Sequence, residues 1–215
     1  MEISARVVEP SDGLFRTIPG FEAAGLEIRY LNRLENNEEV LKFNERFVKA
    51  CEDNDKPLLK SLLERKNIPI LMWYIKKAFS QLAASKNYEF LNILIEAGLD
   101  LGHKIFQGTI PRLVIMLGGN EEDFEKIMII MLKGGMQIDD SDSESNSTGL
   151  HLACLRLDVG VARILLKLKA HPTPINKMKL TPLNLVENDD CEEAREIKTL
   201  IENAGGESKW NSYMD

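Results

Sequence analysis

The sequence predicts an all-α fold in which pairs of helices stack on one another as repeats. Landmark residues recur with a period of 33 residues, from Ala50 to Ala83 and from Thr148 to Thr181. Roughly a dozen residues after the landmarks come apolar runs with the spacing of helices that bury one wide face. Several of these runs end at glycine, which readily adopts the left-handed conformation that closes a helix.

The second helix of each predicted pair is the clearer of the two. A turn separates it from the landmark, and a loop follows it. The predicted second helices are Leu58–Glu64, Phe90–Glu96, Ile127–Lys133 and Ile164–Lys167, with stop signals at Gly98, at Gly134 with Gly135, and at Gly205 with Gly206. The predicted unit is therefore helix, turn, helix, stop and loop.

The stretch TGLHLACLRLDVGVARILLKLKAHP, which begins at Thr148, resembles an ankyrin repeat. That family pattern contains T-P-L-H-x-A in a unit of about 33 residues. Gly149 stands where the family has proline, and Asn184 stands where the next repeat would have histidine. The third repeat departs further, with Ile110-Pro111-Arg112-Leu113 at its turn and extra residues in 118–123.

The resemblance implies a solenoid of five ankyrin repeats between residues 41 and 206. Their expected bounds are 41–72, 73–104, 105–142, 143–175 and 176–206, flanked by an N-terminal arm (1–40) and a C-terminal tail (207–215). Because a single repeat cannot bury its apolar face, the outer repeats need caps. Apolar residues of the arm are candidates for the first cap: Phe15, Phe21, Leu26, Tyr30 and Leu31.

In the family the loops project as fingers, and partners bind the finger tips and the inner helices. Counting without gaps from Ala50 to Ala83 places the first finger on residues 70–77, which are unusually apolar. Exposed aromatic residues and methionine are typical of interface cores. The predicted contact residues are Leu71, Met72, Trp73 and Tyr74. The alternative is that this segment extends a helix packed under the N-terminal arm.

The finger before the fourth repeat is acidic, with four acids and three serines in residues 139–146. A solvated loop is the default interpretation. Calcium binding is disfavoured because the glycine and the terminal glutamate of a calcium loop are missing. An acidic contact and phosphorylation are the other hypotheses, and the candidate phosphorylation sites are Ser141, Ser143 and Ser145.

Two further segments are candidate contact sites. Lysines surround the last finger, and Lys177 and Lys179 are predicted to meet an acidic partner, since Lys167 and Lys169 already suit a helix C-terminus. In the tail, Trp210 and Tyr213 either cap the last helix or form a docking peptide.

The sequence contains no catalytic or metal-binding pattern. His151 and Cys154 are three residues apart, but the resemblance gives both structural roles: the histidine ties the turn and the cysteine fills a core position. His103 and His171 lack neighbours at metal-ligand spacing. The paired glycines lack the lysine and spacing of a phosphate-binding loop. We therefore expect no enzyme, no cofactor and no small-molecule substrate.

Charge and composition restrict the class of partner. Thirty-four acidic against 27 basic residues give a net charge of -7, which disfavours nucleic-acid binding. The longest nearly unbroken apolar run, Ile68–Ile75, is shorter than the ~20 residues that span a bilayer, and the N-terminus does not resemble a secretory signal. Three widely spaced cysteines indicate a reducing compartment. We expect a cytoplasmic protein, with association with the cytoskeleton as one option.

The resemblance and the charge together predict a protein that binds other proteins. The leading hypothesis is a scaffold or structural subunit within a multi-subunit assembly, without nucleic acid or membrane. One alternative is a stoichiometric regulator, inhibitor or assembly chaperone of an enzyme or ATPase. Another is a microbial effector.

Overall fold

The computed structural model describes residues 37–65, 68, 70–102, 106–117 and 120–207. The described part is predominantly helical, which confirms the predicted all-α class. The chain forms two compact units, residues 1–82 with 89–99 and residues 83–88 with 100–215. Much of the N-terminal arm and of the tail, including Trp210 and Tyr213, lies outside the described residues, as does His103. The predictions made for those residues stay predictions.

The first unit contains the helices α2 (Glu38–Glu52), α3 (Lys56–Leu63), most of α4 (Met72–Ala84) and most of α5 (Tyr88–Glu96). Asn37 caps α2, and Asp55 caps α3 by accepting the backbone N–H of Leu58 at 2.9 Å. Each cap satisfies backbone donors at a helix start that have no partner within the helix. Helix α2 begins at Glu38, within the stretch assigned to the arm.

The prediction that residues 70–77 form a loop is wrong from Met72 onward, where α4 begins. Asn44, buried in α2, accepts the backbone N–H of Leu71 at 2.8 Å and so fixes the chain just before this helix. Ile70 and Ile75 are completely buried. From Met72 the segment is therefore helical, as the alternative interpretation held, whereas packing under the N-terminal arm concerns residues outside the description and stays a prediction.

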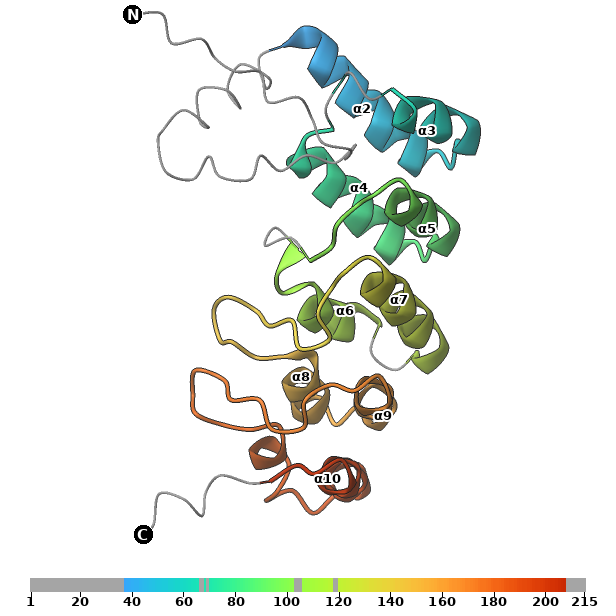
Figure 1. The fold of residues 1–215 in the computed structure, drawn as a ribbon. Helices are drawn as coiled ribbons and strands as arrows, with labels where there is room; N and C mark the ends of the chain where they lie inside the picture. Colours follow the sequence, from blue (N-terminus) through green and yellow to red (C-terminus); the bar gives the residue numbers. More distant parts are fainter. Residues whose placement is uncertain (1–36, 66–67, 69, 103–105, 118–119, 208–215) are drawn as a thin grey trace, which may run out of the picture. The chain divides into compact units, whose positions relative to one another are not determined.

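The second unit consists of two layers of helices (Figure 1). The first helices of the pairs form one layer: α6 (Thr109–Leu117), α8 (Gly149–Leu155) and the short 3₁₀ helix η2 (Leu183–Leu185). The second helices form the other: α7 (Glu121–Lys133), α9 (Val159–Lys167) and α10 (Glu192–Asn203). Residues 110–113, predicted to be a turn, lie in α6, where Pro111 sits in the first turn that tolerates proline.

The predicted second helices and their stop signals are confirmed. Each predicted second-helix range falls largely or entirely within α3, α5, α7 or α9. Gly98, Gly135 and Gly205 have φ angles of 96°, 91° and 83°, the left-handed conformation expected at helix ends. At the end of α9, Lys169 adopts this conformation instead, with φ at 72°.

The landmark pairing of Ala50 with Ala83 is one residue out of register. Asn54 and Lys86 have matching φ angles of 55° and 57° directly before the N-cap residues of α3 and α5. Counting back from these two residues aligns Ala83 with Cys51. The first two repeats are therefore spaced by one residue less than the sequence suggested.

Candidate partner-binding surface

Two long loops of the second unit project from its helices on the same side (Figure 1). We call residues 134–148 the acidic loop and residues 168–182 the basic loop. The acidic loop closes through an antiparallel bridge between Ser141 and Thr148. The basic loop turns at Asn176, whose backbone N–H donates to the carbonyl of Leu180 at 3.1 Å.

Aspartates of the acidic loop tie neighbouring loops together. The Asp140 carboxylate accepts the backbone N–H groups of Gly108 at 2.9 Å and of Ile110 at 3.1 Å. The Asp139 carboxylate accepts the backbone N–H of His171, in the basic loop, at 2.9 Å. Burial raises the pKa of Asp140, although its hydrogen bonds to backbone N–H groups act in the opposite direction.

Asp142 holds the tip of the acidic loop. Its carboxylate accepts the backbone N–H groups of Glu144 at 2.9 Å, Ser145 at 2.7 Å and Ser147 at 3.0 Å. These hydrogen bonds and that from the Ser145 hydroxyl outweigh burial and lower the pKa of Asp142. The acids at 139, 140 and 142 thus bind the protein's own backbone. The hypothesis of an acidic contact for a partner stays a prediction, and Glu144 is the exposed acid of this loop.

The three serines of this loop differ in what their hydroxyl groups do. The Ser145 hydroxyl donates to the Asp142 carboxylate and accepts the backbone N–H of Ser147 at 3.1 Å. The Ser141 hydroxyl donates to the side-chain oxygen of Asn146 at 3.0 Å. Ser143 is exposed. Of the three predicted phosphorylation sites, Ser143 is the most accessible.

The tip of the basic loop combines lysines with exposed apolar side chains. Lys177 and Lys179, both predicted contact residues, are exposed. Met178 lies between them and is 74% exposed, and Ile175 is 37% exposed. The exposure of these two apolar residues was not predicted, although the sequence shows both of them beside lysines in a polar loop.

The tip is held in place by the acidic loop. The backbone N–H of Lys177 donates to the Ser145 carbonyl at 2.8 Å, and the Lys177 ammonium donates to the Ser143 carbonyl at 2.8 Å. The side-chain amide of Asn146 donates to the Ile175 carbonyl at 3.2 Å. The exposed side chains of the tip therefore stand on a backbone that a neighbouring loop fixes.

The apolar segment of the first unit presents one large side chain to solvent. Trp73, in the first turn of α4, is 71% exposed. Tyr74 and Leu71 are half-buried, and the side chain of Met72 is outside the description. Trp73 is thus the predicted anchor that the fold leaves most accessible.

A further set of exposed apolar residues was not anticipated from the sequence. Ile115 is 56% exposed and Leu155 is 67% exposed, near the C-terminal ends of α6 and α8. The two helices pack on each other, and each exposed residue follows a buried one, Ile110 or Leu150, by five positions. Ile115 and Leu155 therefore occupy corresponding positions on adjacent helices.

His151 joins the fourth helix pair to the loop that leads into the fifth. Its Nδ1 accepts the Thr148 backbone N–H at 3.2 Å, and this fixes the ring proton on Nε2, which donates to the Leu180 carbonyl at 3.1 Å. In the next pair, the Asn184 side-chain oxygen accepts the Thr181 backbone N–H at 3.0 Å. Burial lowers the pKa of His151.

The neighbouring cysteine has the environment of a core residue. Cys154 is completely buried, and burial raises its pKa to about 12. A nucleophilic cysteine must be present as thiolate near neutral pH. The burial of Cys154 confirms the core position that the resemblance implied for it.

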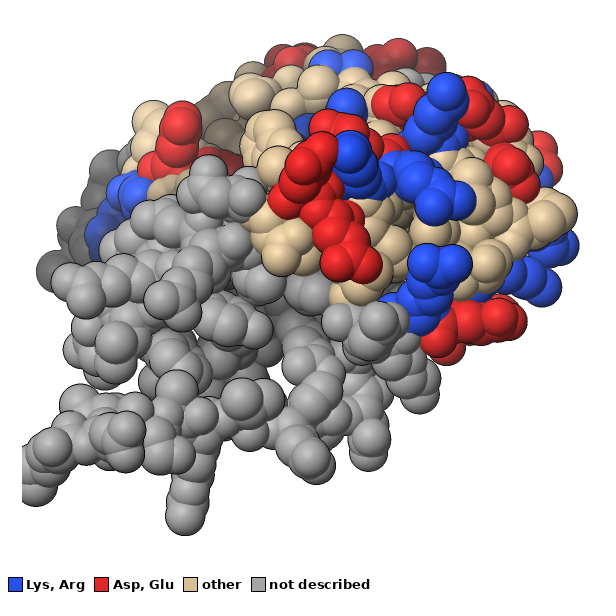
Figure 2. Space-filling view, turned by 90° about the horizontal axis from the view of Figure 1, so that it is seen from above, with Lys and Arg blue, Asp and Glu red and all other residues tan. Residues whose placement is uncertain are grey.

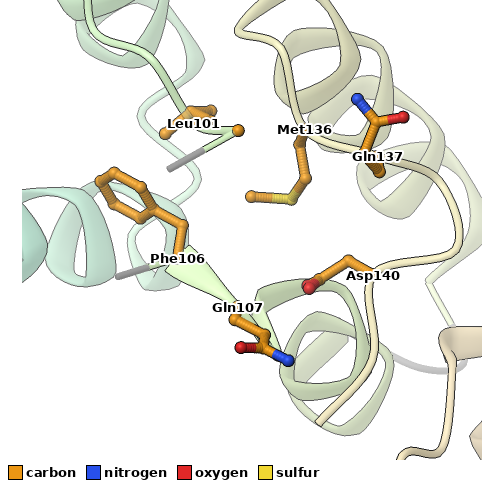
Figure 3. A pocket seen from close by; sticks show the side chains of 7 residues that line it. Leu101, Phe106, Gln107, Met136, Gln137 and Asp140 are labelled. Atoms are coloured by element: carbon orange, nitrogen blue, oxygen red, sulfur yellow. The ribbon is translucent and has the colours of Figure 1, made fainter. Parts of the chain in front are cut away.

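A pocket of about 210 Å³ opens beside the acidic loop (Figure 3). Leu101, Phe106 and Met136 form its apolar side. Asp140 lies at its edge, but its carboxylate accepts the two backbone bonds given above and so anchors the loop. Among the described residues, no group of three or more His, Cys, Asp or Glu could hold a metal ion.

The charges of the described surface are mixed. In Figure 2, acidic and basic side chains lie among one another over the described part of the face shown. Ion pairs also join neighbouring helices of the second unit, such as Arg163 with Glu196 at 2.6 Å and Lys167 with Glu125 at 2.6 Å. Within the described ranges, no helix is long and apolar enough to cross a membrane.

Comparison with known proteins does not assign this chain to a family. No protein-family model and no curated protein matches this chain.

Proposed function

We propose that this chain is a non-enzymatic protein-interaction module of the ankyrin-repeat type. Successive helix pairs along the described residues support the repeat assignment, and three of their turns have a residue with positive φ directly before the N-cap of the second helix: Asn54, Lys86 and Leu157. The Thr148–His151 and Thr181–Asn184 contacts, 33 residues apart, support it further, because they repeat one hydrogen bond at the position of the family's histidine. The buried, protonated thiol of Cys154 supports the non-enzymatic part of the proposal.

The observation that carries the binding function is the tip of the basic loop. Its Met178 side chain is 74% exposed although three hydrogen bonds, two at the tip's backbone and one from the Lys177 ammonium, hold the tip to the acidic loop. An exposed apolar side chain on a fixed backbone is suited to insert into a partner's pocket. Lys177 and Lys179 beside it favour an acidic surface around that pocket.

The partner in this proposal is a protein with an acidic rim around an apolar groove. The mixed charges in Figure 2 and the net charge of -7 favour a protein over nucleic acid. Trp73 provides a second contact, in the first unit. With exposed apolar residues in both units, a structural or scaffolding subunit of a larger assembly is the role we favour. The free thiols at Cys51, Cys154 and Cys191 favour a reducing compartment such as the cytoplasm.

Affinity purification with cross-linking mass spectrometry tests the proposal. We expect the doubly substituted Lys177→Glu, Lys179→Glu protein and the Met178→Asp protein each to retain less than about a tenth of the partner, since contacts of this kind contribute about 1.4 kcal/mol or more. Lys60→Glu, an equal charge change per site on the exposed face of α3, is the matched control. Unchanged partner yield in both loop variants would contradict the proposed surface.

The contribution of Trp73 is measured in the same experiment. We expect Trp73→Ala to lower the partner yield while leaving the helical circular dichroism signal unchanged, because the side chain is 71% exposed. A loss of helical signal would show instead that Trp73 stabilises the fold.

A further inference from the structure

The Ser143 hydroxyl lies at the turn of the acidic loop, at a point where a cation from the next loop is already present. Ser143 is exposed, and its own carbonyl accepts a hydrogen bond from the Lys177 ammonium at 2.8 Å. A phosphate on the Ser143 side chain would be only a few bonds from that carbonyl. The lysine ammonium is carried by a flexible four-carbon stem, so it is not confined to this carbonyl.

The backbone around this position is fixed on both sides. Asp142 accepts the backbone N–H groups of Glu144 and Ser145, and the Lys177 backbone N–H donates to the Ser145 carbonyl at 2.8 Å. Ser143 and Lys177 are thus held near each other by contacts that do not involve the Ser143 hydroxyl. A phosphate placed there would meet the lysine without reordering the loops.

We propose that Ser143 is a phosphorylation site whose phosphate is held by Lys177 of the basic loop. In the reaction, the Ser143 oxygen attacks the γ-phosphorus of ATP bound to a protein kinase. The bond from that phosphorus to the bridging oxygen breaks, ADP leaves, and the hydroxyl proton passes to the kinase's catalytic base. The product carries close to two negative charges at neutral pH.

The sequence around Ser143 identifies the class of kinase. Asp142 precedes the serine and Glu144 follows it, and Glu144 is exposed. A kinase with a basic substrate-binding site would recognise these charges, whereas one with an acidic site would be repelled. The Asp142 carboxylate already accepts three backbone N–H groups, and this offsets its repulsion of a neighbouring phosphate.

The phosphate would change the charge at the tip of the basic loop. Lys177 would be paired with it, which leaves Lys179 as the exposed cation beside Met178. This consequence rests on the proposed function: the modified protein would bind an acidic partner more weakly. The phosphorylation site and its pairing with Lys177 do not depend on any partner.

The pairing is tested by installing phosphoserine at position 143 of the full chain during translation and titrating it by ³¹P nuclear magnetic resonance. An isolated phosphoserine has a second pKa near 6. We expect the phosphate pKa to be lowered by roughly half a unit by Lys177 and to return in the Lys177→Gln protein. Lys179→Gln is the matched control. An equal phosphate pKa with and without Lys177 overturns the pairing.

The site itself is tested by treating the purified chain with ATP and an acid-directed protein kinase, followed by mass spectrometry of its peptides. We expect phosphate on Ser143, its loss in Ser143→Ala, and its retention in Ser145→Ala. Absence of phosphate, or equal incorporation in Ser143→Ala, overturns the site. Partner capture by the phosphoserine protein is then compared with the unmodified protein, with a decrease of about tenfold expected. If the phosphate pairs with Lys177 but capture is unchanged in both this protein and the lysine variants, the proposed function fails and the phosphorylation site stands.

Discussion

Replacing His151 separates its contacts with Thr148, through the backbone N–H and the hydroxyl, from its hydrogen bond to the Leu180 carbonyl. In His151→Asn, the amide oxygen can still accept the Thr148 backbone N–H, as the Asn184 oxygen does for Thr181 at 3.0 Å. The shorter side chain loses the bond to the Leu180 carbonyl. In His151→Ala both bonds are lost. The two variants therefore distinguish the local cap of α8 from the tie to the next loop.

The sizes of the two effects follow from which groups are left without partners. The Leu180 carbonyl also accepts the Asn176 backbone N–H. When His151→Asn removes the bond from the histidine ring, this carbonyl therefore keeps one hydrogen-bond donor. We expect that variant to lose about 1 kcal/mol of unfolding free energy. His151→Ala also leaves the buried Thr148 N–H unpaired and opens a cavity, and we expect a loss of about 3 kcal/mol.

His151 also predicts how stability depends on pH. Its Nδ1 must be unprotonated to accept from Thr148, and burial lowers its pKa in the folded chain. His151 therefore makes its full contribution to the unfolding free energy at a pH above its pKa in the unfolded chain, about 6.5. This contribution is lost as the pH falls through the lower pKa of His151 in the folded chain. The drop in stability between about pH 7.5 and about pH 5.5 should be smaller in His151→Asn.

Urea unfolding followed by far-ultraviolet circular dichroism measures these quantities. His171→Ala, at an exposed histidine of the basic loop, is the matched control and should change stability by less than about 0.5 kcal/mol. The reasoning is refuted if His151→Asn is as damaging as His151→Ala, or if the pH dependence of stability is the same with and without His151.

Three other substitutions test the packing and the exposed surface of the second unit. A β-carbon at Gly149 would lie 2.7 Å from the Ile110 Cγ2 atom, so Gly149→Ala should lower the unfolding free energy by about 1–3 kcal/mol. At Gly160 the three nearest atoms would all belong to the Glu121 side chain, which can rotate away, so Gly160→Ala should leave stability unchanged or raise it by up to about 1 kcal/mol. Equal urea midpoints for the two proteins would contradict this. Leu155→Asp should leave the melting temperature unchanged because Leu155 is 67% exposed, and a lowered melting temperature would show that something covers this residue.

The features that the sequence predicted well are those determined by local chemistry. The second helices follow from their apolar spacing, and the glycines at 98, 135 and 205 follow from the conformation that closes a helix. The exposure of Lys177 and Lys179 could also be anticipated, because the default for a lysine in a loop is to face solvent.

The features that were missed depend on residues far apart in the chain. The 33-residue spacing predicts a loop at residues 70–77 only if every repeat has a loop at this position. Instead, the backbone N–H of Leu71 donates to the side chain of Asn44, 27 residues earlier, and this hydrogen bond fixes the start of α4. The roles of Asp139 and Asp140 were missed for a related reason. Their partners are backbone N–H groups about 30 residues away. Because almost every residue has a backbone N–H, the sequence alone does not show which of these groups the aspartates bind.

The aspartate ties also affect how the loops exchange hydrogen with solvent. Amide protons in exposed connections usually exchange rapidly, but those of Gly108, Ile110 and His171 donate to carboxylates of the acidic loop. These three amide protons should exchange as slowly as those of the neighbouring helices, because their hydrogen bonds to the carboxylates break only when neighbouring loops separate. The binding surface would then be formed when the protein folds, before any partner arrives, and deuterium uptake at these three amides would report the opening of the loops directly.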